Sequence, residues 1–139
     1  MKKTTLLNPA LSALVAQCGH FDEITVGDAG LPIPAHVERI DMALSPGVPS
    51  LVACIDALLT ELQIQSVTLA TEIIEINPQV HQQILQRIEQ EQRHSGRQIE
   101  VVYISHDAFK QQSHHSRAIV RSGECTPYAN VIFSCGVPF

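Results

Sequence analysis

The chain has 139 residues, and its nine Lys and Arg against fourteen Asp and Glu give a formal charge of -5. This mild acidity argues against nucleic acid or an anionic membrane as the main partner. The length suits a single domain over residues 1–139, and 45% apolar residues allow a core that needs no metal or disulfide for stability.

Charged residues make up only 17% of the chain, below the level of about 25% that is usual in globular domains, which predicts that another subunit covers part of the surface. Seven His is a high number for this length, and His titrates near neutral pH. The four cysteines form no C-x-x-C pair and are expected to be small buried residues in a reducing cytoplasm. No apolar run approaches the roughly 20 residues that span a bilayer, and no signal-peptide pattern develops.

In chain order, the first predicted helix follows the Asn-Pro pair at residues 8–9, a capping side chain and a first-turn proline, and ends at Gly19. Alternation of apolar and polar residues at 24–26 predicts a short strand. Residues 28–47 hold three prolines and two glycines, and we expect them to form a long ordered loop. Such loops are usually functional in small domains.

A second helix is predicted to start at Pro49 and to bury one apolar face as far as Leu62. Residues 67–70 are a buried strand candidate, and the Asn-Pro pair at 77–78 starts a third helix that ends near Gly96. The next segment, residues 99–104, is nearly all apolar and β-branched, which predicts a central strand.

A short polar helix over residues 107–116 and two strands at 118–120 and 131–133, separated by a turn around Pro127, complete the pattern. This alternation of helices and strands predicts an α/β fold: a single domain with three α/β/α layers and a largely parallel, mixed sheet. In such folds ligands bind beyond the carboxyl ends of the strands, so the residues that follow each strand are the first candidates for a site.

Two candidate residues flank the first predicted strand. His20 follows a helix-ending glycine, which puts it at a turn; the alternative is a structural His that interacts with the helix dipole. Asp28 directly follows the strand, and the alternative is an Asp that caps a turn. The glycine spacing around Gly30 matches neither a dinucleotide fingerprint nor a P-loop, which argues against nucleotide binding there.

Two candidate pairs follow later strands. His106 and Lys110 are four residues apart, so on a helix they share a face and could bind oxygens or exchange protons; the alternative is a solvated first turn. Tyr128 and Asn130 point the same way in an extended chain and suit the recognition of hydroxyl groups, whereas the alternative is a simple turn. The other five histidines are interpreted as surface residues without a role; they are His36, His81, His94, His114 and His115.

Taken together and in this order, these stretches resemble the D-ribose pyranase family of sugar mutarotases. The resemblance covers nearly the whole chain, and its matching runs are Gly19-His20, residues 28–34, residues 39–44, residues 47–50, residues 121–130 and Gly136-Val137. The related L-fucose mutarotases share the Gly-His and Asp-Ala elements, but residues 30–34 and 125–127 look like the ribose branch.

The resemblance implies interconversion of the β-pyranose and β-furanose forms of D-ribose, with no cofactor and no metal. It also implies a cytoplasmic homo-oligomer, a decamer of two pentameric rings with sites near subunit boundaries, which would explain the sparse charge. His20 matches the family's proton donor, and the sugar-binding positions that match are Asp28, His106, Lys110, Tyr128, Ala129 and Asn130.

Ring interconversion requires one group to protonate the departing ring oxygen and another to take the proton of the anomeric hydroxyl. A His suits this work because it gives and takes protons at neutral pH. Our hypothesis is that His20 acts at the ring oxygen, that Asp28 orients His20 or holds a sugar hydroxyl, and that His106 and Lys110 bind hydroxyls and assist the second transfer.

Two other classes of function stay open on the sequence. A sugar-binding accessory or regulatory module of ribose uptake would use the same side chains without turnover. A metal-dependent hydrolase would use the excess of His, although the adjacent His114 and His115 have no second cluster of ligands to support them.

Overall fold

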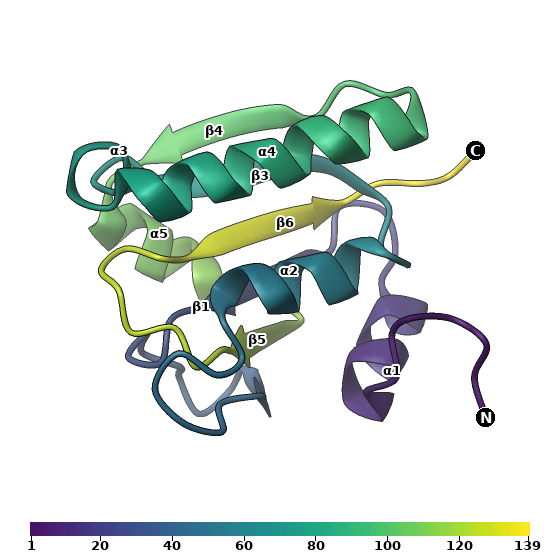
Figure 1. Cartoon of the computed structure of the whole chain (residues 1–139), viewed down its shortest axis with the longest axis horizontal. Helices are drawn as coiled ribbons and strands as arrows, with labels where there is room; N and C mark the ends of the chain where they lie inside the picture. The colour runs from purple at the N-terminus through teal and green to yellow at the C-terminus, as the bar shows by residue number, and fades with distance from the viewer.

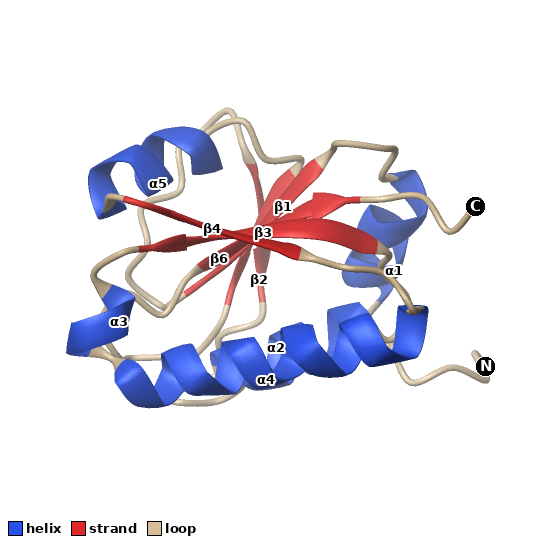
Figure 2. Ribbon diagram, turned by 90° about the horizontal axis from the view of Figure 1, so that it is seen from above, coloured by secondary structure: helices blue, strands red, loops and turns tan.

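One six-stranded sheet lies between two layers of helices in the computed structural model, which describes all residues, 1–139 (Figure 1, Figure 2). The strand order is β2-β5-β1-β6-β3-β4. The predicted three-layer α/β fold with a mixed sheet is therefore confirmed. The elements in chain order are α1 (Pro9–Gln17), β1 (Glu23–Gly27), β2 (Glu38–Asp41), α2 (Leu51–Leu59), β3 (Ile64–Ala70), α3 (Ile73–Ile76), α4 (Pro78–Ser95), β4 (Glu100–Ile104), α5 (His106–Ser113), β5 (Ala118–Arg121) and β6 (Val131–Cys135).

Strand β6 runs antiparallel to its neighbours β1 and β3, whereas the other pairings in the sheet are parallel. Figure 1 shows β6 and β4 pointing in opposite directions. We call the edge where the five parallel strands end the carboxyl end of the sheet, and the edge where they begin the amino end. Because β6 is reversed, it starts at the carboxyl end and finishes at the amino end.

The helices divide the core into two parts. Helices α2 and α4 cover one face of the sheet and α5 covers the other (Figure 2). The larger core cluster lies on the α2 and α4 side and also takes in Leu11 and Leu14 of α1. The smaller cluster forms around the fully buried Phe109 of α5. Burial of apolar side chains on both faces of the sheet is what stabilises a three-layer arrangement.

Local sequence signals set the ends of two helices. Asn8 caps α1, because its Oδ1 accepts the N–H of Leu11 at 2.9 Å. Asn77 caps α4 in the same way, and Gly96 ends that helix in the left-handed conformation with φ of 69°. Both capped starts and the glycine stop were predicted from these residues, and the structure confirms them.

Two elements differ from the prediction because their sequences carry weak signals. The expected long loop at residues 28–47 contains β2, a strand in which Ile40 is the buried member and its neighbours are exposed, so no apolar alternation marks it. The short helix α3 was not predicted, since four residues are too few to show a helical period. The second helix begins at Leu51 with Ser50 as its cap, whereas Pro49 lies outside it.

The prediction that residues 99–104 form a central strand is wrong. They form β4, which lies at the edge of the sheet and pairs with β3 alone. Its side chains are half-buried or exposed, and Tyr103 is 37% exposed. Apolar, β-branched residues favour any strand whose faces are partly buried, so their composition does not distinguish a central strand from an edge strand.

Two predictions about single side chains need correction. His81 is buried on α4 rather than on the surface, and its Nε2 lies 2.7 Å from the hydroxyl of Tyr103. Burial lowers the pKa of His81 and raises the pKa of Tyr103. Cys54 and Cys135 are buried as predicted, but Cys18 is half-buried and Cys125 is exposed.

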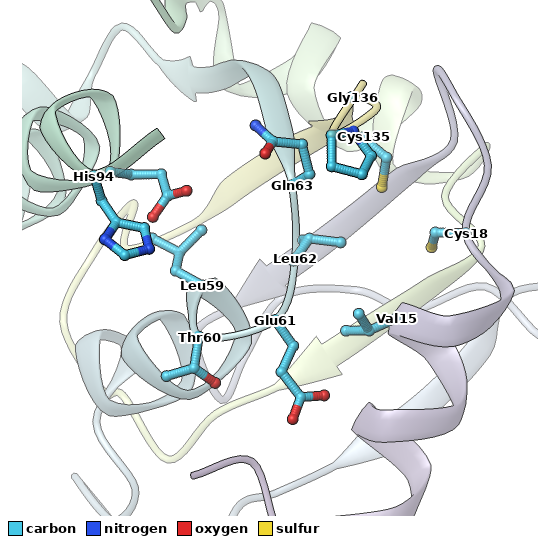
Figure 3. Close-up of a pocket in the computed structure, with 12 residues that line it drawn as sticks. Val15, Cys18, Leu59, Thr60, Glu61, Leu62, Gln63, His94, Cys135 and Gly136 are labelled. Atoms are coloured by element: carbon cyan, nitrogen blue, oxygen red, sulfur yellow. The ribbon is translucent and has the colours of Figure 1, made fainter. Parts of the chain in front are cut away.

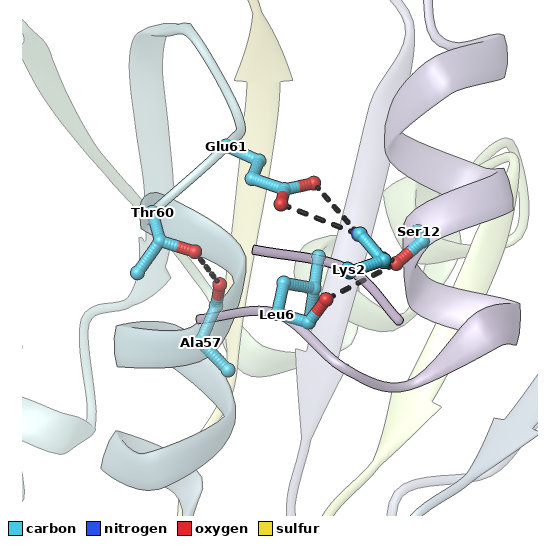
Figure 4. A network of polar contacts seen from close by, with 6 residues as sticks. All are labelled: Lys2, Leu6, Ser12, Ala57, Thr60 and Glu61. Atoms are coloured by element: carbon cyan, nitrogen blue, oxygen red, sulfur yellow. Dashed lines mark hydrogen bonds and ion pairs between the residues drawn. The ribbon is translucent and has the colours of Figure 1, made fainter. Parts of the chain in front are cut away.

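The N-terminal segment is fixed by polar contacts between α1 and the end of α2 (Figure 4). Lys2 Nζ donates to Ser12 Oγ at 2.7 Å and pairs with a carboxylate oxygen of Glu61 at 3.3 Å. Leu6, four residues after Lys2, is buried in the larger core cluster. None of the helices combines the length and the apolar character that a membrane span requires.

Candidate functional site

The carboxyl end of the sheet brings Asp28 and Asn130 into contact. Asp28 follows β1 and Asn130 precedes β6, and these two strands are antiparallel neighbours. Asn130 Oδ1 accepts the backbone N–H of Asp28 at 2.9 Å, and Asn130 Nδ2 donates to Asp28 Oδ2 at 3.0 Å. The other carboxylate oxygen of Asp28 accepts the N–H of Gly30 at 2.8 Å. The orientation of this carboxylate is therefore fixed before any ligand binds.

The close approach of Asn130 explains the glycine at position 27. A Cβ at Gly27 would lie 3.0 Å from Asn130 Oδ1 and 2.6 Å from a methyl group of Leu31. Any larger residue would push the amide away from Asp28. Asn130 is fully buried, so its amide acts as part of the floor of the site.

The segment that precedes β6 links this pair to α5. Tyr128 adopts a positive φ of 56°, and its ring meets the ring of His106 edge to face, with centroids 5.0 Å apart. Ala129 between Tyr128 and Asn130 is completely buried, so only its backbone could face a ligand.

His106 stands at the first position of α5, where Ser105 is the cap. Its backbone N–H donates to a carboxylate oxygen of Glu72 at 2.9 Å, which ties α5 to the segment after β3. The side-chain Nδ1 of His106 is buried without a hydrogen-bond partner, and such unpaired polar atoms call for a specific explanation. Lys110 follows one turn later and pairs with Asp107 at 3.1 Å.

A second group of polar side chains holds the loop that follows Asp28. Arg121 Nε donates to the carbonyl oxygen of Ala29 at 3.0 Å, and its Nη1 pairs with Asp41 at 3.0 Å. The backbone carbonyl oxygen of Glu124 accepts the N–H of Ala29 at 2.8 Å. The pKa of Asp41 is lowered, first by the backbone N–H of Ala43 and then by Arg121.

The structure does not bring His20 to this group. His20 lies three residues before β1, at the amino end of the sheet, whereas Asp28 lies directly after β1 at the carboxyl end. Five residues of strand separate these positions, or about 16 Å at 3.3 Å per residue. Within one chain, Asp28 therefore does not orient His20.

His20 is exposed, and its surroundings differ from those of Asp28. Its ring stacks on Phe21 with centroids 3.8 Å apart, and its Nε2 lies 2.8 Å from Oε1 of Gln65 on β3. Phe21 has a positive φ of 67° and is itself 67% exposed. The turn is held by Asp22, whose carboxylate accepts the N–H of Gly19 at 2.8 Å.

A cavity of about 310 Å³ also opens at the amino end, between α1, α2 and the C-terminal segment (Figure 3). Cys18 and Cys135 both line it. The proximity of these two thiols lowers the pKa of Cys18 and raises the pKa of Cys135.

Several of these contacts carried no signal in the sequence. Gln65 is a polar residue inside a strand, and Glu72 lies in a segment without a motif. Glu124 lies within the matching run at residues 121–130, but nothing local shows that its backbone would contact Ala29. Each becomes relevant only through strand order and loop packing. No group of three or more His, Cys, Asp or Glu side chains is arranged to hold a metal ion.

A three-layer α/β fold with carboxylate, amide, phenol and imidazole groups gathered at the carboxyl end of its sheet defines a protein built to bind a small polar molecule. Residues 1–138 match the RbsD / FucU transport protein family, and the chain belongs to that family. It is 52% identical to the D-ribose pyranase of Vibrio parahaemolyticus over 139 residues, which are the full length of both chains.

Two solved structures resemble the fold over nearly its whole length. Bacillus subtilis RbsD, in a structure complexed with D-ribose, superposes with a TM-score of 0.91 at 36% identity and 100% coverage of both chains. The fucose mutarotase of Streptococcus pneumoniae, in complex with L-fucose, gives a TM-score of 0.77 at 23% identity and 99% coverage of both chains. The second likeness concerns the fold alone.

Proposed function

We propose that this protein is an isomerase that interconverts the β-pyranose and β-furanose forms of D-ribose. The observation that carries the proposal is the full-length similarity to D-ribose pyranases, at 52% identity for the Vibrio parahaemolyticus protein. The carboxyl-end group of Asp28, Asn130, Tyr128 and His106 supports it, since donors and acceptors fixed by the fold suit the hydroxyl groups of a sugar.

The chemistry needs two proton transfers and no redox change. The bond between the anomeric carbon and the ring oxygen breaks as the ring oxygen gains a proton and the anomeric hydroxyl loses one. The open-chain aldehyde then recloses through a different hydroxyl. In our proposal, His20 serves the ring oxygen, and His106 with Lys110 binds hydroxyls and assists the second transfer. The sugar is held by Asp28, Tyr128, Asn130 and the backbone of Ala129.

His20 reaches the sugar in this proposal from a second copy of the chain. The supporting observation is the distance of about 16 Å along β1 that separates His20 from Asp28 within one chain. An exposed apolar side chain lies at each end of the sheet. Phe21 is 67% exposed beside His20 at the amino end, and Leu44 is 82% exposed at the carboxyl end, where Asp28 lies. Contact between the two ends of neighbouring copies would cover both.

The same proposal includes a homo-oligomer in the cytoplasm, a decamer of two pentameric rings. The low fraction of charged residues, 17%, supports extensive contact between copies. Strand β4 supports it too, because its outer edge has no partner strand and its apolar side chains are half-buried, and native proteins usually cover such an edge.

Nuclear magnetic resonance magnetisation transfer between the ring forms of D-ribose tests the activity. Protein at far below the sugar concentration is expected to accelerate the exchange. A sugar-binding accessory module, the second function that suits a transport protein family, would bind ribose without accelerating the exchange. An unchanged exchange rate would therefore reject the isomerase proposal in favour of that second function.

Subunit complementation tests the shared site. The variants His20→Ala and Asp28→Asn are each expected to be inactive when expressed alone. Co-expressed in one cell, they should assemble into mixed oligomers in which about a quarter of the sites combine an intact His20 with an intact Asp28. Recovery of activity supports the shared site, and mixed oligomers without activity would contradict it.

A further inference from the structure

The imidazole of His20 has a defined partner although it stands on the surface. Its Nε2 lies 2.8 Å from Oε1 of Gln65, a residue 45 positions further along the chain. The stacked ring of Phe21, with centroids 3.8 Å away, restricts rotation of the imidazole. A surface His held on both sides in this way is positioned before any ligand arrives.

Gln65 reaches His20 because the sheet is irregular at that point. The register between β3 and β6 shifts between Ile64 and Ser66, so that Gln65 is the extra residue of a β-bulge. Bulges redirect side chains and are common next to functional sites. Gly136 leaves room for the bulge, since a Cβ at position 136 would lie 3.3 Å from the Cβ of Gln65.

The other end of the Gln65 amide is also anchored. Its Nε2 donates to Ser134 Oγ of β6 at 3.4 Å, which turns the carbonyl oxygen toward His20. A carboxamide oxygen accepts hydrogen bonds and cannot donate them. His20 must therefore carry a proton on Nε2 to pair with it, and this leaves Nδ1 of the neutral ring without a proton.

We propose that Gln65 is the positioning residue of His20: it holds the ring in the Nε2–H tautomer and leaves Nδ1 as the atom that exchanges a proton with the sugar. The inference rests on the proposed function. When Nδ1 takes up a proton, the Nε2–H···O bond becomes charge-assisted and stronger. Gln65 thus stabilises the imidazolium that the reaction requires.

The charged groups around this turn do not replace Gln65. The Asp22 carboxylate is occupied by the N–H of Gly19 and by Arg117 at 3.6 Å. Glu23 accepts from the Gln112 amide on the opposite side of the sheet from α2. The thiols of Cys18 and Cys135 act on each other's pKa, and no hydrogen bond joins either of them to His20.

Three variants separate the role of Gln65 from a general effect on folding. Gln65→Leu removes the acceptor, and Gln65→Glu replaces it by a charged acceptor of the same length. Gln63→Leu is the control, since the Gln63 side chain donates to the carbonyl oxygen of the adjacent Ile64 and does not touch His20. Circular dichroism and the oligomer mass show which variants are folded.

Kinetics provide the first measurement. Gln65→Leu is expected to lower kcat for ring exchange about tenfold with little change in KM, as expected for one lost hydrogen bond to a charged group. The midpoint of the pH–rate profile should move to lower pH in Gln65→Leu and to higher pH in Gln65→Glu. The control should match the wild type in both quantities. Midpoints that stay fixed in both Gln65 variants would overturn the proposal.

Ring ¹⁵N spectra of the wild-type protein provide the second measurement. It does not depend on activity, and it requires a variant only to assign the signal of His20. The signal of His20 is the one missing from His20→Ala. An Nε2–H tautomer supports the proposal, and an Nδ1–H tautomer overturns it. If His20→Ala keeps full activity, His20 does not have the role that the proposed function gives it. If His20→Ala is inactive while Gln65→Leu has the kcat and pH–rate profile of the wild type, only the role of Gln65 is rejected.

Discussion

The two ends of the sheet are built differently. At the carboxyl end, Asp28 has both carboxylate oxygens and its backbone N–H occupied, and its partner Asn130 is fully buried. At the amino end, His20 is exposed and is held by one amide and one stacked ring. The proposed sugar-binding groups are therefore fixed within one chain, whereas the proposed proton-transfer group is accessible at the surface.

This contrast follows from the direction of β6. Because β6 is antiparallel to β1, its first residues meet the last residues of β1, and a loop-to-loop hydrogen bond between Asn130 and Asp28 becomes possible. At the other end, five residues connect α1 to β1, and Phe21 among them lies in the left-handed region. The side chains of His20 and Phe21 at the tip of this turn are exposed.

The largest expected effect comes from the amino end. His20→Ala is expected to lower the rate of ring exchange about 10²–10⁴-fold, the usual contribution of a general acid or base. Ribose binding and the unfolding temperature should change little, because the His20 side chain is exposed. Magnetisation transfer, calorimetric titration with ribose and thermal unfolding measure these three quantities. A large loss of stability would break the contrast between the two ends.

The opposite pattern is expected at the carboxyl end. Asn130→Ala removes two hydrogen bonds from Asp28 and leaves its half-buried backbone N–H and carboxylate oxygen without these partners, so we expect a loss of about 1–3 kcal/mol in the free energy of unfolding. Ribose binding should weaken at the same time. Urea unfolding and calorimetric titration measure both, with Gln98→Ala, an exposed amide, as the control. Normal stability in Asn130→Ala would show that the site is not preorganised.

Two helix caps provide a smaller, matched comparison. Asn77 caps α4 and also donates to Thr126 Oγ1 and to the carbonyl oxygen of Pro127, each at 2.9 Å, just before Tyr128. Asn8 caps α1, and its Nδ2 donates to Met42 Sδ at 3.5 Å rather than to this loop. We expect each Asn→Ala change to cost about 1 kcal/mol of stability, with the greater loss at Asn77. Only Asn77→Ala should also weaken ribose binding; equal affinities in the two variants would contradict the link to Tyr128.

The smallest expected effect concerns acid stability at the carboxyl end. The Ala43 N–H, and then Arg121, lower the pKa of Asp41 in the folded protein. A lowered pKa stabilises the fold above about pH 4 and loses this contribution as the pH falls through the folded value. Asp41→Asn should therefore cost about a few tenths of a kcal/mol at pH 7, since the pair is partly exposed, and should show a flatter dependence on pH below 4. Urea unfolding between pH 3 and pH 7 measures the difference, and parallel curves would contradict it.

Much of the fold could be predicted because its signals are local. The Asn-Pro pairs at residues 8–9 and 77–78 each act on the first turn of their own helix. Strand β2 and the edge position of β4 could not be predicted, because both depend on which strands lie side by side. Position in a sheet is a property of the whole chain.

The same distinction between local and long-range signals applies to the site. Asp28 and Asn130 could be selected because they border strands, where an α/β fold places its ligands. The contact between Gln65 and His20 could not, since it depends on the order β6-β3 and on a bulge that no local pattern marks. The separation of His20 from Asp28 likewise depends on the full length of β1, which lies between them.

The central position of β6 has a consequence for synthesis on the ribosome. A nascent chain emerges with its N-terminus first, and β6 is the last strand to leave the ribosome although it joins β1 to β3. Without residues 131–135 no strand connects the group β2-β5-β1 to the pair β3-β4. Asn130 and Ser134 arrive with that strand, so the anchors of Asp28 and of Gln65 are completed in the same final step. A chain that stops short of β6 would lack both.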